Sequence, residues 1–424
     1  MTTFLEPGDT GYDAARSIWN AMIDRRPALI ARCTTTADVV EAVHLAHMRN
    51  LEIGVRCGGH SIAGLAVPDG GLMIDLTPMG AVEIDLERQT AIVQGGALLG
   101  ELDRAAQRYG LATTAGNVSH TGVGGLTLGG GMGWLARQFG LACDNVTAYE
   151  VVTAAGDVVR ATADENADLF WGLRGGGGNF GIVTSFEFRL HEIGTRALVA
   201  EFTYPLEAAY DALRGWRELN TQAPREATFT ASITPDGVTL GYVWIGPLGS
   251  DLLPKFRELG PVVKESVESM PYLTLQSRDD SIQGHRYRRY WKGHYFKSLP
   301  DEAIKALIGT PGVTASLQAY GGAIADTPDG DAAFSHRDTL FEFVTAARWE
   351  DPADDEARIA RVREYAAGLT PYTSGVYMNT LNGEAINRAF PPEKLARLAE
   401  LKAKYDPTNL FHLNQNIAPA ILVG

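Results

Sequence analysis

Three glycine-rich stretches in the first half of the chain constrain its fold more than any other feature. They cover residues 56–64, 116–133 and 175–181, and the first presents His60 directly after Gly58 and Gly59. Glycine lets backbone amides approach a ligand closely and adopt positive φ angles, so such loops suit a large phosphate-bearing cofactor. Any one of them could be a tight turn between strands, but three in one domain favour a cofactor site.

Length, charge and cysteine content exclude several classes of protein. A chain of 424 residues exceeds what one hydrophobic core usually fills, so we expect two domains. A formal net charge of -14 argues against nucleic acid as a partner, because that binding depends on lysine and arginine neutralising phosphates. Cys33, Cys57 and Cys143 have no spacing suited to zinc, and no apolar run approaches the ~20 residues of a membrane span. We therefore expect a cytoplasmic protein without metal, disulfide framework or membrane partner.

The first half of the chain alternates helical and strand patterns. Residues 35–50 predict a helix with Thr35 or Thr36 as its cap, and residues 98–110 predict another that Gly110 ends. Short strands are predicted at 51–56, 71–76, 81–85 and 90–96.

The pattern after residue 148 leads to a second type of sheet. Residues 148–162 predict a hairpin, and residues 168–190 predict a helix, a glycine loop and a strand. Beyond a boundary near residue 195, residues 227–246 read as two alternating strands joined by a Pro-Asp-Gly turn, which indicates an antiparallel sheet. An amphipathic helix at 206–219 would cover this sheet, and the last forty or so residues predict a separate helix and tail.

Two short motifs are pattern matches without the context that their chemistry needs. Gly176, Gly178 and Gly181 match GxGxxG, but a helix precedes them and a strand follows, which reverses the order of a dinucleotide fingerprint. The sequence around Ser61 has Ala63 where a nucleophile elbow has its last glycine. Neither a nicotinamide site nor a serine hydrolase is therefore expected.

Histidines and basic residues elsewhere offer weaker signals. His44 and His47 lie three residues apart on the predicted helix without a carboxylate to complete a metal site, so we interpret them as solvated. The basic and aromatic run at 285–297 could stack bases and hold phosphates. We favour a strand or helix edge whose aromatic rings pack a core or a pocket wall, with a binding module as the alternative.

Four segments together carry a resemblance to a known family. They are "RCGGHSIAG", "GNVSHTGVGGLTLGGGMGWLARQFGLACDNV", "DLFWGLRGGGGNFGIVTSFEF" and "LAELKAKYDPTNLFHLNQNIAP". In this order they resemble the berberine-bridge-enzyme-like branch of the vanillyl-alcohol-oxidase flavoproteins, with bacterial members the most similar. The resemblance implies an α+β fold of two domains, a PCMH-type FAD-binding domain and an antiparallel-sheet substrate domain. The implied ranges are 1–195 for the FAD domain, 196–375 for the substrate domain, and 376–424 for a C-terminal segment that returns to the FAD domain.

The resemblance also implies FAD as the cofactor and His60 as its covalent attachment point, at the 8α carbon of the flavin. Many relatives carry a second link from a cysteine, but Val118 stands at that position and Cys143 lies beyond it, so we predict one link only. The implied cofactor-binding residues lie in the three glycine loops and the C-terminal tail: Arg56, Cys57, Gly58, Gly59, His60, Ser61, Ser119, His120, Gly122, Gly125, Thr127, Gly129, Asn179, Gly181, Ile182, Val183, Asn414 and Asn416.

The implied catalytic residues match the family less well. Gln318 and Tyr320 alternate along one predicted strand and so share a face, and Tyr377 is kept in "YMNT" although Thr380 replaces a tyrosine of relatives. A carboxylate or glutamine used by other members would fall at Val344. Tyr320 is the best candidate for handling a proton or orienting substrate, with a plain pocket wall as the alternative.

The function implied is an FAD-dependent oxidase that takes a hydride from a CH–OH or CH–N carbon of a small molecule and reduces oxygen to hydrogen peroxide. Thr121 stands where relatives place the valine that admits oxygen, and threonine has nearly the shape of valine. The alternatives are a flavin dehydrogenase and a redox-neutral flavoenzyme. Small-molecule substrate and oxygen are the expected partners of a monomer or homodimer, and the substrate itself stays open.

Overall fold

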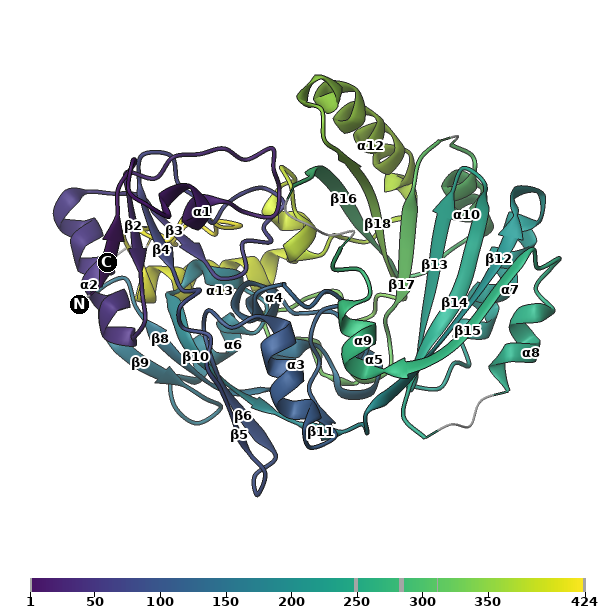
Figure 1. Cartoon of the computed structure of the whole chain (residues 1–424), viewed down its shortest axis with the longest axis horizontal. Helices are drawn as coiled ribbons and strands as arrows, with labels where there is room; N and C mark the ends of the chain where they lie inside the picture. Colours follow the sequence, from purple (N-terminus) through teal and green to yellow (C-terminus); the bar gives the residue numbers. More distant parts are fainter. Residues whose placement is uncertain (1, 248–250, 282–285, 311, 422–424) are drawn as a thin grey trace.

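The computed structural model describes residues 2–247, 251–281, 286–310 and 312–421. Figure 1 shows two parts side by side, one built on the strands β1 to β10 and the other on a broad sheet that begins with β12. The yellow C-terminal segment lies among the elements of the first part, although it follows the second part in the sequence. This mixed helix and sheet architecture, with two large antiparallel sheets, is the α+β fold that the resemblance implied.

Two sheets form the first part. One has the order β1-β2-β4-β3, with parallel pairing of β4 to both β2 and β3, and comprises β1 (Thr3–Leu5), β2 (Leu29–Arg32), β4 (Leu72–Asp75) and β3 (Ile53–Arg56). The other is antiparallel and comprises, in order, β5 (Val82–Asp85), β6 (Thr90–Gln94), β10 (Ile182–Arg189), β8 (Val146–Val152) and β9 (Val158–Ala161). A short pair joins β7 (Leu111–Ala112) to β11 (His191–Glu192).

Local sequence signals account for the helices of this part. Helix α2 (Thr36–Arg49) begins after Thr35, whose side chain accepts from the Asp38 N–H while the Asp38 carboxylate accepts from the Thr35 N–H. This capping box satisfies donors that the helix itself leaves without partners. The remaining helices are α1 (Tyr12–Arg16), α3 (Leu99–Gln107), α4 (Val123–Leu128), α5 (Ala136–Phe139) and α6 (Ala167–Leu173).

The broad sheet of the second part has seven antiparallel strands in the order β15-β12-β14-β13-β17-β18-β16. Their bounds are β15 (Lys264–Pro271), β12 (Arg196–Pro205), β14 (Gly237–Ile245), β13 (Ala227–Thr234), β17 (Ala315–Ala319), β18 (Phe341–Trp349) and β16 (Arg288–Phe296). One face buries an apolar core under four helices, α7 (Ala209–Asn220), α8 (Leu252–Arg257), α10 (Asp301–Ile308) and α12 (Asp355–Leu369). Along β18 the residues that face this core alternate with those that face the other way, as the pleat of a strand requires.

The opposite face of the seven-stranded sheet meets the first part of the molecule. Thr228 on β13 donates to the Trp134 carbonyl at 2.9 Å, and the buried Arg137 donates to the Tyr320 carbonyl. Two short helices lie at this junction, α9 (Tyr272–Ser277) beside α3 and α11 (Ala323–Asp326) beside α5. The junction therefore brings strands of the broad sheet close to the glycine loops.

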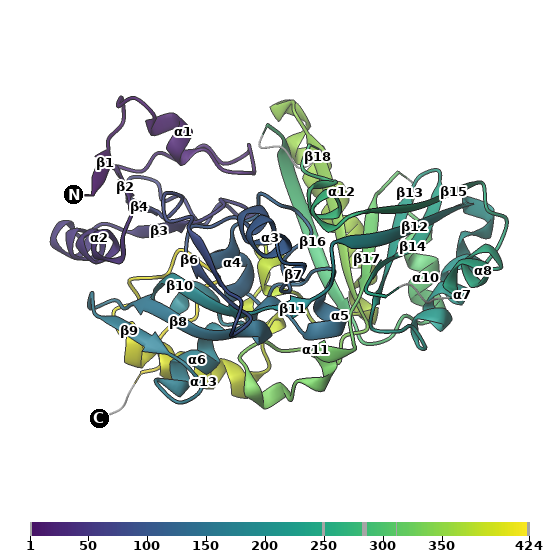
Figure 2. The ribbon, with the colours of Figure 1, turned by 60° about the horizontal axis from the view of Figure 1, so that its bottom comes forward.

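The C-terminal helix α13 (Pro392–Tyr405) packs beside α6 of the first part (Figure 2). Buried Lys402 donates to the carbonyls of Asn179 and Phe411 and to the Asp406 carboxylate at 2.6–2.9 Å. The amide of Asn179 in turn donates to the Gln415 carbonyl and accepts from the Ile417 N–H. These bonds fix the tail against the third glycine stretch; its last three residues lie outside the described part of the chain.

Several local predictions are confirmed. The turn at Pro235-Asp236-Gly237 joins β13 to β14, and a helix precedes the third glycine stretch while β10 follows it, which confirms the reversed order. The basic and aromatic run forms β16, at the edge of the seven-stranded sheet, while its first residue, His285, lies outside the described residues. Both His44 and His47 are exposed on α2, as expected.

Within the described ranges, no group of His, Cys, Asp and Glu has the geometry of a metal site. None of the described helices has the length and apolar character that crossing a membrane requires.

Candidate active site

The first and second glycine stretches touch through their backbones. A Cβ atom on Gly58 would overlap the backbone nitrogen of Gly122, and one on Gly122 would overlap the nitrogen of Gly58 and the sulfur of Cys57. Only glycine at both positions permits this approach. Gly59 has a positive φ of 67°, which turns the chain so that His60 follows at the contact between the two loops.

His60 lies between aromatic neighbours at this contact. Its ring stacks on Trp19 with centroids 4.8 Å apart and an angle of 12° between the planes. Its Nε2 lies 2.6 Å from Nδ1 of His120, and its Nδ1 lies 3.4 Å from the hydroxyl of Thr121. The structure therefore brings His60 of the first stretch together with His120 and Thr121 of the second, a contact that the sequence did not reveal.

Buried polar atoms without a hydrogen-bond partner within the protein indicate whether this region fits FAD. Among the described residues, the buried Oδ1 of Asn414, Oγ1 of Thr127 and Oδ1 of Asn117 have no hydrogen-bond partner. A Cβ on Gly125, at the start of α4, would meet no atom within 4 Å, so that backbone borders open space. Buried polar atoms normally find partners. Unmatched polar atoms beside glycine loops suit a nucleotide cofactor with many polar groups, so these residues fit FAD.

Other residues predicted to bind the cofactor have partners within the protein. Arg56 donates to the Ala15 carbonyl at 2.8 Å, and the Cys57 thiol approaches the Ala97 carbonyl at 3.5 Å. The Ser61 hydroxyl accepts from the Leu65 N–H at 3.3 Å. These contacts shape the first loop, and direct contacts of these side chains with FAD stay a prediction.

The second loop and the strand β10 complete the predicted set. The hydroxyl and N–H of Ser119 both donate to the Asp280 carboxylate, at 2.5 and 3.1 Å. Gly129 packs so closely on the side chain of Asn379 that a Cβ would overlap it. Gly181, Ile182 and Val183 are buried at the start of β10, and Asn416 is exposed on the tail. Asn179 uses its amide to hold the tail, which is a structural role that the sequence did not reveal.

Cys143 is fully buried in an apolar cluster with Tyr295, Tyr320 and Tyr377. Burial raises the pKa of its thiol above the usual range, so the sulfur stays protonated. The thiolate is the nucleophilic form of cysteine, and a buried thiol of this kind is chemically inert. The environment of Cys143 therefore supports the prediction of no second flavin link there.

A tyrosine and a carboxylate form the buried polar centre of the sheet face. The Tyr320 hydroxyl donates to Oε2 of Glu342 at 2.9 Å and lies 3.4 Å from the Tyr295 hydroxyl. Cross-strand pairing sets this arrangement, because Glu342 on β18 lies directly opposite Gln318 on β17 and Tyr295 on β16. The two predicted residues Gln318 and Tyr320 thus share a face, as their alternation implied.

Burial tunes this pair toward proton transfer at neutral pH. It raises the pKa of Glu342 to about 7, although the hydrogen bond from Tyr320 opposes the rise. Burial, and then the charge of Glu342, hold the pKa of Tyr320 well above its usual value of 10. Tyr320 is therefore a neutral phenol at pH 7, and Glu342 is the group whose protonation changes near that pH.

Glu342 is a site residue that the sequence alone did not reveal. The resemblance places the family's carboxylate or glutamine at Val344, which lies two residues farther along the same face of β18. The alternation in "LFEFV" could have pointed to this residue. Glu342 is the single acidic residue there, and Phe341 and Phe343 lie on the other face of the strand. An acidic residue in so apolar a strand needs a buried partner.

Gln318 and Tyr377 link the sheet face to the glycine loops. Gln318 accepts from the Asn117 amide at 2.9 Å, while its own amide nitrogen is buried without a partner among the described residues. The Tyr377 hydroxyl accepts from the N–H of Gly131 and from the Asn379 amide, both at 2.8 Å. Burial raises the pKa of Tyr377, so it positions the loop as a neutral phenol.

Comparison with known proteins identifies the family. Residues 27–162 match the family described as FAD binding domain, and residues 376–418 match the one described as berberine and berberine like. The chain is 32% identical to (R)-6-hydroxynicotine oxidase of Paenarthrobacter nicotinovorans in an alignment of 445 positions, gaps included, that covers 98% of this chain and 96% of that protein. The chain belongs to the berberine-bridge-enzyme-like family of FAD-linked oxidoreductases.

Solved structures of this family agree with the fold. The crystal structure of 6-hydroxy-D-nicotine oxidase from Arthrobacter nicotinovorans superposes with a TM-score of 0.89 at 29% identity, over 99% of this chain and 98% of that one. Glucooligosaccharide oxidase from Acremonium strictum gives 0.89 at 25% identity, over 99% and 97%, and its flavin is described as 6-S-cysteinyl, 8α-N1-histidyl FAD. As a member of this family, the chain is an FAD-dependent oxidoreductase.

A hydrogen bond to the buried carboxyl group of Asp103 joins helix α9, which follows β15 of the broad sheet, to α3. The Gln276 amide donates to Oδ2 of Asp103 and to the Gly116 carbonyl, both at 3.0 Å. Burial raises the pKa of Asp103 to about 7, against a weaker opposing effect of the Gln276 hydrogen bond. The native state therefore binds a proton at Asp103 that the unfolded state has already released between about pH 4 and 7.

We predict that Asp103→Asn removes this pH dependence. Because the native carboxyl holds its proton more tightly, its contribution to stability is full below pH 4 and falls by about 1.4 kcal/mol for each pH unit up to 7. The stability of the variant relative to the wild type should rise over this range and level off above it. Urea titrations of both proteins at pH 5 and pH 8 measure the difference, and an unchanged difference contradicts the prediction.

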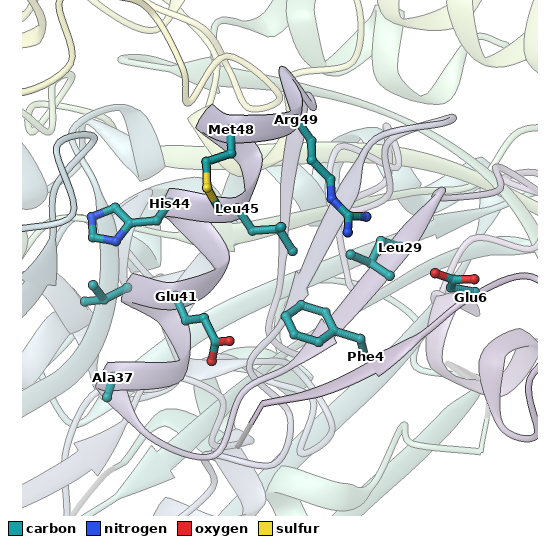
Figure 3. Close-up of a pocket in the computed structure, with 10 residues that line it drawn as sticks. Phe4, Glu6, Leu29, Ala37, Glu41, His44, Leu45, Met48 and Arg49 are labelled. Atoms are coloured by element: carbon teal, nitrogen blue, oxygen red, sulfur yellow. The ribbon is translucent and has the colours of Figure 1, made fainter.

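A surface hollow of about 560 Å³ lies away from this site. Figure 3 shows it beside α2, where Phe4, Leu45 and Met48 supply apolar walls and Glu41 and Arg49 supply charge. None of its lining residues belongs to the glycine loops or to the seven-stranded sheet. It is therefore separate from the FAD site and from the Tyr320–Glu342 pair.

Proposed function

We propose that this enzyme is an oxidase with FAD attached through His60 alone, which oxidises a CH–OH or CH–N carbon of a small organic molecule. The hydrogen-bonded pair of Tyr320 and Glu342 carries the proposal, because removal of a hydride from such a carbon also requires removal of a proton from its oxygen or nitrogen. Bound FAD supplies the hydride acceptor. The relatives' names, a hydroxynicotine oxidase and an oligosaccharide oxidase, support both substrate types.

The protein's own part in the reaction is proton transfer. The substrate oxygen or nitrogen gives its proton to the Tyr320 hydroxyl, which passes its own proton to Glu342 across 2.9 Å. A base is most effective when its pKa lies near the working pH, and Glu342 meets this condition. Tyr295 and Gln318, which flank Glu342 across the sheet, orient the substrate.

Oxygen is the proposed electron acceptor. Thr121 lies at the contact of the two glycine loops, 3.4 Å from Nδ1 of His60. The resemblance places it where relatives have the valine that admits oxygen. The proposed second product is hydrogen peroxide.

A screen of secondary alcohols, sugars and cyclic amines without air tests the proposed reaction. At least one class should bleach the flavin absorbance, and admitting air should restore the colour with one hydrogen peroxide formed per substrate. Flavin that a substrate bleaches but that only an artificial dye reoxidises would instead establish a dehydrogenase. Product formation without any change in flavin colour would favour the redox-neutral alternative.

A further inference from the structure

The two histidines at the contact of the glycine loops form a direct pair. Nε2 of His60 and Nδ1 of His120 are 2.6 Å apart, and the ring centroids are 4.7 Å apart with the planes at 45°. At this distance one nitrogen donates a proton and the other accepts it. The pair therefore decides which nitrogen of the His60 ring holds the proton and which offers its lone pair.

Other segments hold the backbone on both sides of the pair. The backbone N–H of Trp19 donates to the Gly59 carbonyl at 3.0 Å, and the Trp19 ring stacks on the face of His60. On the other loop, the N–H groups of Leu99 and Gly100 at the start of α3 donate to the carbonyls of Thr121 and Ser119, on either side of His120. The backbone around the pair is thus fixed, so its geometry does not depend on the side chains alone.

We propose that His120 is a positioning residue for the attachment of FAD to His60. Its Nδ1 accepts a hydrogen bond from Nε2–H of His60, which places the lone pair of the His60 ring on Nδ1. The reactive nitrogen then points away from His120, and it is the nitrogen that Thr121 approaches. This proposal rests on the covalent link proposed above and adds the residue that makes His60 a nucleophile.

The attachment balances as an oxidation of the flavin methyl group. A bond forms between Nδ1 of His60 and the 8α carbon, which loses one hydrogen as a proton. His60 loses the Nε2 proton through His120, and the two electrons and two protons reduce the flavin ring. Oxygen then takes up both electrons and both protons and leaves as hydrogen peroxide, so the net change is loss of one hydrogen from each partner. An adjacent base of this kind typically accelerates such a step about 10²-fold or more.

Attachment rates in purified protein test the role of His120. Protein expressed with limiting riboflavin is mixed with FAD, and the fraction of chains that retain flavin after acid denaturation is measured over time. The affinity for non-covalent FAD is measured separately. At saturating FAD, where a change in affinity no longer affects the rate, His120→Ala should attach flavin about 10²-fold more slowly than the wild type. His120→Asn, whose amide oxygen can accept from His60 but takes no proton, should give an intermediate rate. His44→Ala, which removes an exposed histidine of α2, should attach flavin at the wild-type rate.

A second measurement uses the wild-type protein and so does not depend on whether a variant folds. Nuclear magnetic resonance of the isolated flavin peptide should place the bond on Nδ1 of His60. A bond on Nε2, or attachment by His120→Ala at the wild-type rate, overturns the role of His120 while leaving the covalent link intact. Absence of covalent flavin from the wild type overturns the link itself, and both outcomes hold even if one variant fails to fold.

Discussion

Glu342→Gln should lower kcat/KM by about 10²- to 10⁴-fold while FAD content and folding stay unchanged. The amide still accepts the hydrogen bond of the Tyr320 hydroxyl, which lies 2.9 Å from the native carboxylate. It takes up no proton, so the relay from substrate through Tyr320 ends without an acceptor. A steady-state assay with any substrate found by the anaerobic screen measures the loss.

The pH profile separates this role from a structural one. The pKa of Glu342 is about 7, so the ionised, proton-accepting form grows as pH rises through that value. Wild-type kcat/KM should therefore increase with pH up to about 7 and then level off, while the variant shows no such increase. Tyr320→Phe should cost a similar factor, and the double variant should be little worse than either alone, because the two residues act as one unit. A Glu342→Gln enzyme with wild-type activity contradicts the relay.

His60→Ala should release all of the flavin from acid-precipitated protein. FAD bound only by the glycine loops and the tail dissociates when the chain unfolds, so the yellow colour should move from the pellet to the supernatant. Cys143→Ala is the matched control: its thiol is buried and protonated, and its removal should leave the colour in the pellet. Colour that stays with the His60→Ala chain would place the link on another residue.

The sequence predicted those parts of the fold that depend on local signals. Thr35 caps α2 by hydrogen bonds within four residues, and Pro235-Asp236-Gly237 turns β13 into β14 within three. The reversed order around Gly176 was also readable, because a helix and a strand differ in the period of their apolar residues. Each of these needs no knowledge of distant parts of the chain.

The missed features depend on pairing between distant segments. His60 and His120 are sixty residues apart, and the contact of Gly58 with Gly122 brings the loops that carry them together. Strands β17 and β18 pair in a register that places Gln318 opposite Glu342, and this register brings Glu342 to Tyr320. No local sequence pattern fixes that register. The bonds of the Asn179 amide to the C-terminal tail join segments more than two hundred residues apart, which no local pattern predicts, and its predicted contact with the cofactor stays a prediction.

Peptide mapping of the wild-type enzyme by mass spectrometry shows whether FAD is attached to the chain through His60 alone. After expression with ample riboflavin, one FAD mass is expected on the peptide that contains His60, and none on the peptides that contain Cys143 or the second glycine loop. An intact chain whose mass equals that of its amino acids alone, or an FAD mass on another peptide, contradicts this expectation.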